Sequence, residues 1–163
     1  MEYKLIFLLS LFLLISQVSS FDEIEYVLNR GFMGRAIDHF LLRVNKETGI
    51  YAEFERYNQI SVKENDEEEE EEISNLKSYN INNEQFNILP NTELFEELNK
   101  IEFPENEDCA NHNLFDVPYW QLKVNGKNYR GNVGTDFLTE FTNLVKLTEI
   151  KEYVVKQYDN NSE

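Results

Sequence analysis

The residues best suited to chemistry lie in one short stretch, 109–112, which starts at Cys109, ends at His112 and is flanked by Asp108 and Asp116. Thiols, imidazoles and carboxylates bind zinc, and a spacing of three residues lets Cys and His reach one ion. A structural zinc site needs four protein ligands and is usually rich in Cys, but this chain has a single Cys. A Cys–His nucleophile pair normally joins distant parts of a chain. We therefore predict no metal ligand, no catalytic residue and no cofactor.

The sequence contains no Gly-x-Ser-x-Gly elbow, no His-Glu-x-x-His pair, no P-loop and no dinucleotide fingerprint. His39 falls within an expected strand, where we predict a half-buried structural role. Carboxylates are numerous enough for a glycosidase, but a small domain with a single Trp offers little wall for a substrate cleft. The chain is therefore expected to be non-enzymatic, and a small extracellular hydrolase is the alternative.

Three further features could support binding or modification. Cys109 is either a small buried apolar side chain or the site of a disulfide between two chains. Tyr119 and Trp120 lie in the most apolar segment after the leader. They belong either to the core or to an exposed binding patch. Asn160 heads the one N-glycosylation sequon, at 160–162, and is a candidate glycan acceptor.

Alternating apolar and polar residues predict three strands in the first part of the chain, at 21–29, 36–44 and 50–57. Glycines lie in the first connection, and the second ends at Gly49, so tight turns are expected between them. The three strands should therefore form an antiparallel meander.

The second half of the chain alternates between helical and strand patterns. An amphipathic helix is expected at 91–101 and a longer one at about 136–157. Between them, strands at 117–124 and 127–133 flank Asn-Gly, the strongest two-residue hairpin signal. We predict one α+β domain at 21–157 and a flexible tail at 158–163. Its sheet should have five mostly antiparallel strands, with helices on one face.

An acidic low-complexity segment separates these two halves. Six consecutive glutamates, Glu67 to Glu72, follow Asp66. Like charges at this density repel one another and resist burial, so a solvated surface insertion is expected at about 61–80. A calcium loop needs alternating Asp or Asn ligands and a Gly, which this run lacks. An acidic patch for a basic partner is the alternative role.

The first twenty residues are typical of a secretory leader. A short head with one Lys precedes the apolar run 5–15, and small polar residues lead to Ser20. The run is too short for a membrane span, which needs about 20 apolar residues. We predict cleavage after Ser20 and a protein secreted to the extracellular space or the lumen of the secretory pathway, not held in a membrane.

The charge of the chain limits the classes of partner that it can bind. The net charge of −16 opposes binding to nucleic acid and to anionic membranes. Another protein, with basic character, is the partner that this surface favours. The expected function is thus that of a secreted acidic binding protein, and the oligomeric state stays open.

Short motifs over residues 23–148 resemble the emfourin-type domains, small α+β inhibitors of thermolysin-like metalloproteases. They are Gly-Phe-Met-Gly at 31–34, a Leu-rich helix ending in Pro at 94–104, Asp-Val-Pro-Tyr at 116–119, Asn-Gly-Lys at 125–127, and the last Leu-rich helix. The chain departs from the pattern at Arg30, in the acidic segment and in the leader. The resemblance implies an inhibitor of a secreted protease, and no inhibitory residue can be carried over.

Overall fold

A computed structural model describes residues 21–32, 35–64, 67–111 and 117–161 of the chain. The predicted leader at 1–20 and two of the chemistry candidates, His112 and Asp116, lie outside the described residues.

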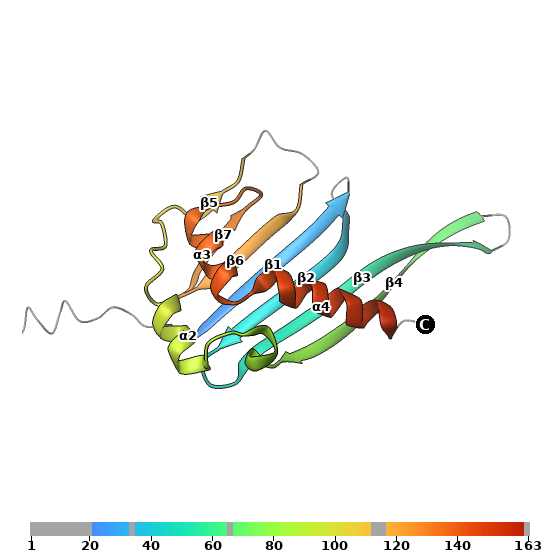
Figure 1. The fold of residues 1–163 in the computed structure, drawn as a ribbon. Coiled ribbons are helices and arrows are strands. Elements are labelled where there is room, and N and C mark those ends of the chain that lie inside the picture. The colour runs from blue at the N-terminus through green and yellow to red at the C-terminus, as the bar shows by residue number, and fades with distance from the viewer. Residues whose placement is uncertain (1–20, 33–34, 65–66, 112–116, 162–163) are drawn as a thin grey trace, which may run out of the picture.

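The centre of the structure is one mixed sheet with the strand order β4-β3-β2-β1-β6-β7-β5. Strand β1 is central and pairs antiparallel with β2 and β6, whereas β5 runs parallel to β7. The β3–β4 hairpin extends beyond the other strands (Figure 1). The strands are β1 (Glu23–Phe32), β2 (Arg35–Asn45), β3 (Gly49–Glu64), β4 (Glu67–Ile81), β5 (Asp108–Cys109), β6 (Tyr119–Val124) and β7 (Lys127–Gly131).

The predicted sheet of five mostly antiparallel strands is wrong, because the structure has seven strands in a mixed sheet. One added strand is β4, which includes the glutamate run and pairs with β3 along its whole length. Backbone hydrogen bonds form a ladder without apolar side chains, so the hydrophobic pattern did not reveal this strand. The last residues of β4 alternate toward the core, where Tyr79 and Ile81 pack.

The other added strand, β5, has two residues and is not among the predicted strands. It is held beside β7, and the backbone amide of Arg130 donates to the carbonyl of Glu107 at 2.9 Å. Such a short strand carries no periodic signal.

The expected helix at about 136–157 is two helices, α3 (Asp136–Leu144) and α4 (Leu147–Asn160). The chain breaks at Lys146, which is left-handed with φ of 54°. The break changes the phase of the apolar stripe, so that Phe141 of α3 and Ile150 of α4 are both fully buried. The helix expected at 91–101 is shorter, α2 (Asn91–Leu98), and follows the short 3₁₀ helix η1 (Asn83–Phe86).

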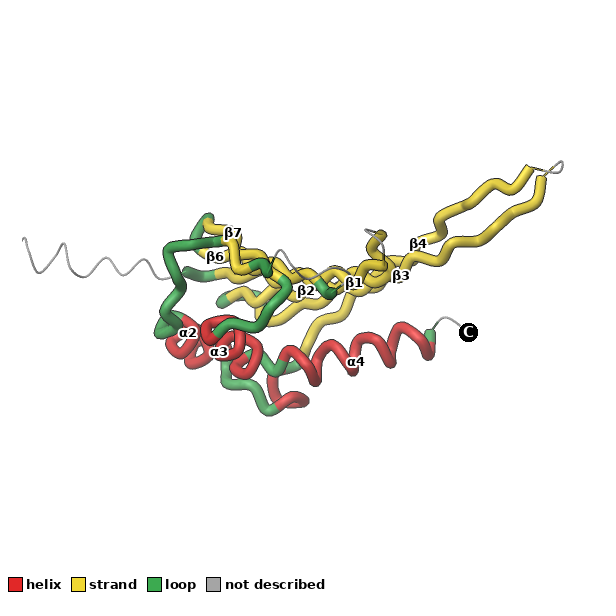
Figure 2. Tube along the Cα trace, turned by 90° about the horizontal axis from the view of Figure 1, so that it is seen from above, coloured by secondary structure: helices red, strands yellow, loops and turns green. Residues whose placement is uncertain are grey.

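The α-helices of the described residues, α2, α3 and α4, lie on one face of the sheet (Figure 2). The inward side chains of the strands and the inner faces of the helices form one continuous core. Burial of this apolar surface is the main term that stabilises the fold. The most deeply buried large side chains are Ile24, Phe40, Leu42, Phe54, Leu94, Phe95, Leu98, Leu122, Tyr129, Phe141 and Ile150.

Candidate functional site: a cleft beneath helix α4

The sequence-predicted candidates do not come together in one site. Trp120 lies in the core at 5% exposure, and its indole Nε1 donates to the carbonyl of Val133 at 2.9 Å. Its neighbour Tyr119 is half-buried. Cys109 is half-buried in β5, and burial, with the charge of Asp108, raises the pKa of its thiol. The binding patch and the disulfide between chains remain predictions.

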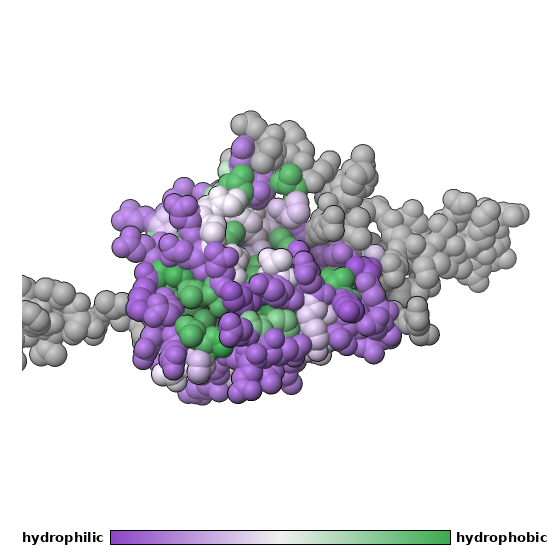
Figure 3. Space-filling model, in the orientation of Figure 1, coloured by the Kyte–Doolittle hydropathy of each residue, from purple (hydrophilic) through white to green (hydrophobic). Residues whose placement is uncertain are grey.

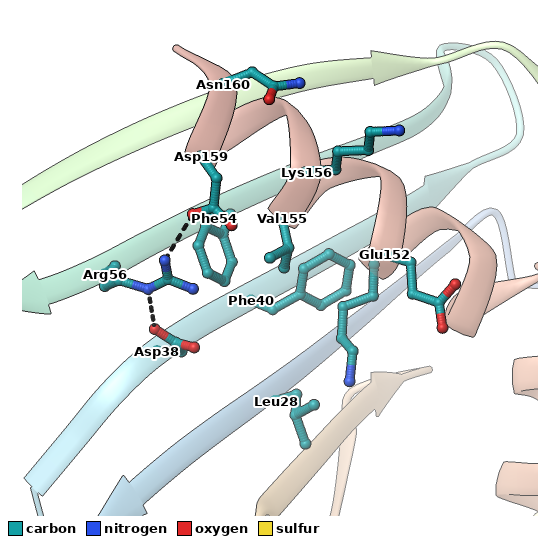
Figure 4. A pocket seen from close by; sticks show the side chains of 11 residues that line it. Leu28, Asp38, Phe40, Phe54, Arg56, Glu152, Val155, Lys156, Asp159 and Asn160 are labelled. Atoms are coloured by element: carbon teal, nitrogen blue, oxygen red, sulfur yellow. Dashed lines mark hydrogen bonds and ion pairs between the residues drawn. The ribbon is translucent and has the colours of Figure 1, made fainter. Parts of the chain in front are cut away.

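A different set of residues surrounds a cleft of about 670 Å³ between α4 and strands β1, β2 and β3 (Figure 4). This volume is within the range of sites for small molecules, about 300–1,000 Å³. Asn160, the candidate glycan acceptor, is the last residue of α4 and lines the cleft. The residues lining the cleft are Leu28, Asp38, Phe40, Phe54, Arg56, Lys151, Glu152, Val155, Lys156, Asp159 and Asn160.

Helix α4 provides two adjacent rows of side chains to this cleft. Residues four apart lie above one another on a helix face. The inner row is Lys151, Val155 and Asp159, next to the buried stripe of α4. The outer row consists of Glu152, Lys156 and Asn160, all exposed.

Arg56 of β3 closes one end of the cleft. Its Nε donates to Oδ1 of Asp38 at 2.9 Å, and its Nη1 donates to Oδ1 of Asp159 at 2.7 Å. The guanidinium carbon also lies 5.4 Å from the ring centre of Phe54 and 5.7 Å from that of Tyr158. The planar fork of Arg allows it to bind two carboxylates and stack on rings at once.

This network has a defined charge. The hydrogen bond to Asp38, with the charges of both carboxylates, raises the pKa of Arg56, although burial alone would lower it. One guanidinium faces two carboxylates, so this group of three side chains carries a net negative charge.

The floor of the cleft is apolar. It is formed by Leu28 of β1, Phe40 of β2 and Phe54 of β3, and Val155 of α4 lies above them (Figure 4). Phe40 and Phe54 are both 2% exposed, so they form a rigid base rather than a mobile patch. Figure 3 shows the molecule in the orientation of Figure 1, with hydrophobic patches among the hydrophilic side chains of this side.

The arrangement is suited to binding. The described residues that line the cleft include no Cys, His, Ser or Thr, and their charged groups are three carboxylates, two lysines and Arg56. No cluster of three or more metal-ligating side chains is found in the part of the chain that the structure describes. An apolar floor with a few charged groups at its edges can bury the body of a small molecule and orient it.

Sequence reasoning did not identify this site, because its members come from β1, β2, β3 and α4. One signal was present: Lys151, Val155 and Asp159 place two charges and an apolar residue in a single row beside the core stripe. Such a row is also common on solvated helices, so it points to a site only once the facing strands are known.

Comparison of the chain with protein-family models, with curated proteins and with solved structures finds no match. The resemblance to emfourin-type domains therefore remains a prediction. In the described residues, no helix has both the length and the apolar character needed to cross a bilayer.

Proposed function

We propose that this chain is a secreted, non-enzymatic binding protein and that its ligand site is the cleft beneath α4. The observation that carries the proposal is the lining of the cleft, an apolar floor with charged groups at both ends. A site of this composition holds the body of a ligand by burial and orients it by its polar groups.

The scaffold supports this proposal because it holds the site in one geometry. The floor belongs to three hydrogen-bonded neighbouring strands, and Leu28 pairs with Phe40 in the register of β1 and β2. Phe40 in turn pairs with Phe54. Side chains locked by strand pairing and core packing lose little entropy when a ligand binds.

A matched pair of variants tests the proposal. Val155→Phe fills the cleft from α4, whereas Thr148→Phe adds the same ring to an exposed position on the same helix that does not line it. Ligands found by a thermal-shift screen of small acids, amines and zwitterions should bind the wild type and Thr148→Phe and be lost in Val155→Phe. Equal binding to both variants would contradict the proposal.

The rival functions have separate tests. Slowing of a secreted thermolysin-like protease by the purified protein would favour the inhibitor alternative, and steady turnover of a glycoside or ester would favour the hydrolase alternative. The predicted basic protein partner is tested by a pull-down from extracellular medium, in which an interaction made by exposed charges weakens as salt is raised.

A further inference from the structure

The charges of the cleft are separated along its length, and this separation indicates the kind of ligand it accepts. The positive end is at Lys151, on the first turns of α4, and the negative end is at Asp38, Arg56 and Asp159, near the last turn. The apolar floor and Val155 lie between them. The inference rests on the proposed function and concerns the same site.

Lys151 is the cation that is free to meet a ligand. It is half-buried in the inner row of α4, and no hydrogen bond or ion pair to it exists in the described part of the structure. Two other free charges, Glu152 and Lys156, belong to the exposed outer row, and both side chains point away from Phe40 (Figure 4). An anionic group over the floor would therefore pair with Lys151.

The other end of the cleft is an acceptor of positive charge. Asp38 and Asp159 each bind Arg56 through Oδ1. Their Oδ2 atoms have no hydrogen-bond partner in the described structure. The side chain of Asp159 is 54% exposed, so a ligand can reach it. With two carboxylates around one guanidinium, this end attracts a cation and repels a second anion.

The distance between the two ends follows from the helix. Lys151 and Asp159 are eight residues apart on one face, which corresponds to a rise of about 12 Å at 1.5 Å per residue. Val155 lies midway in the same row, above Phe40. The space between the charges is therefore apolar and long enough for an extended aliphatic chain.

We propose that the cleft binds an elongated small zwitterion, with an anionic group at Lys151, an apolar body over Leu28 and Phe40, and an ammonium group at Asp38 and Asp159. Burial of the body contributes affinity. The two ends set the direction in which the ligand lies, and they select against molecules that carry only one of the two charges.

Three compounds with the same carbon chain test this proposal: ω-aminooctanoate, octanoate and octylammonium. Calorimetric titration of the purified chain should show that ω-aminooctanoate binds about tenfold more tightly than either of the others, since each loses one charged hydrogen bond. Octanoate or octylammonium binding as tightly as the zwitterion would overturn the proposal.

Variants assign each end of the ligand to its residue. Lys151→Ala should weaken the binding of ω-aminooctanoate and of octanoate several-fold and leave the binding of octylammonium unchanged. Asp159→Asn should weaken the binding of ω-aminooctanoate and of octylammonium. It should leave the affinity for octanoate unchanged or raise it. Lys123→Ala and Asp136→Asn are controls on exposed residues that do not line the cleft. Circular dichroism establishes that all four variants fold.

The outcomes separate this proposal from the proposed function. If ligands bind and are blocked by Val155→Phe but show no preference for the zwitterion, the cleft remains the binding site and the charge assignment is wrong. If the three compounds bind equally well to Val155→Phe and to the wild type, both proposals are wrong.

Discussion

Arg56 of β3 and Asp159 of α4 are 103 residues apart in the chain, and their side chains meet with 2.7 Å between Nη1 and Oδ1. The contact joins the last turn of the final helix to the third strand. Because Asp38 of β2 binds the same guanidinium at 2.9 Å, three elements are joined at one point. This junction closes the cleft.

Replacing Arg56 with Lys should loosen the end of α4. A single ammonium cannot reproduce the fork that binds two carboxylates and stacks on two rings. Because the group is partly exposed, we expect a loss of only about 1 kcal/mol in the free energy of unfolding. Faster hydrogen exchange in the last turns of α4 is the more sensitive measurement.

Arg43→Lys is the control for this prediction. Arg43 pairs with Glu25 at 2.9 Å, and both residues lie on neighbouring strands of the sheet. It should leave exchange in α4 unchanged. Unchanged exchange in Arg56→Lys as well would show that the junction does not hold the helix.

Two glycines provide a matched test of packing near β5. A Cβ at Gly131 would lie 2.7 Å from the carbonyl oxygen of Cys109 and 2.8 Å from Cζ2 of Trp120. Gly131→Ala should therefore cost about 1–3 kcal/mol of stability, because backbone cannot move aside cheaply. At Gly134 an added Cβ meets nothing within 4 Å. Chemical denaturation should show Gly134→Ala to be close to wild type, and equal midpoints for the two variants would contradict the packing described.

Alkaline pH should destabilise the fold through Tyr26. Burial raises the pKa of its phenol from 10.0 to about 12. The raised folded-state pKa means that stability from the neutral phenol is fully present below pH 10 and is lost as the pH rises toward about 12. The loss is about 2–3 kcal/mol by linkage. Denaturation at several pH values should show that the free energy of unfolding of Tyr26→Phe falls less with rising pH than that of the wild type. An identical fall would refute the assignment of the effect to Tyr26.

The predicted leader cleavage has a structural consequence at Phe21. Its ring is 7% exposed and packs edge-on against Phe95 and Phe103, and its backbone nitrogen donates to Oδ1 of Asn99 at 3.2 Å. Cleavage after Ser20 keeps these contacts. Mass spectrometry of the secreted protein should find Phe21 as the first residue, whereas a mature chain that retains residues 1–20 would refute the prediction.

A chain that starts two residues later, at Glu23, should have a free energy of unfolding lower by about 3–5 kcal/mol, the usual cost of removing a buried Phe side chain. Thermal melting of the two forms measures this difference. Similar melting temperatures would show that Phe21 is not an anchor.

Much of the sheet could be predicted because its signal is local. In β1, Ile24 and Tyr26 face the core, and their partners Val124 and Leu122 do the same on β6, as alternation predicts. The hairpin between β6 and β7 turns at Asn125 and Gly126, both with positive φ, as the Asn-Gly pair indicates.

The remaining features depend on contacts that a local pattern does not contain. Strand β4 forms because β3 provides a ladder for its backbone. The helix breaks at Lys146, and the break lets both Phe141 and Ile150 reach the core. The cleft depends on Asp38, Arg56 and Asp159 meeting from three elements, which sequence spacing alone does not predict.

The measurement that tests the account most directly is amide NMR of the purified chain during titration with ω-aminooctanoate. We predict that the largest chemical-shift changes occur at Leu28, Phe40, Arg56, Lys151 and Val155, and that they saturate together. Saturating changes centred instead on Tyr119 would contradict the assignment of the cleft as the binding site. No saturating change at any residue of the cleft would contradict the zwitterion proposed as its ligand.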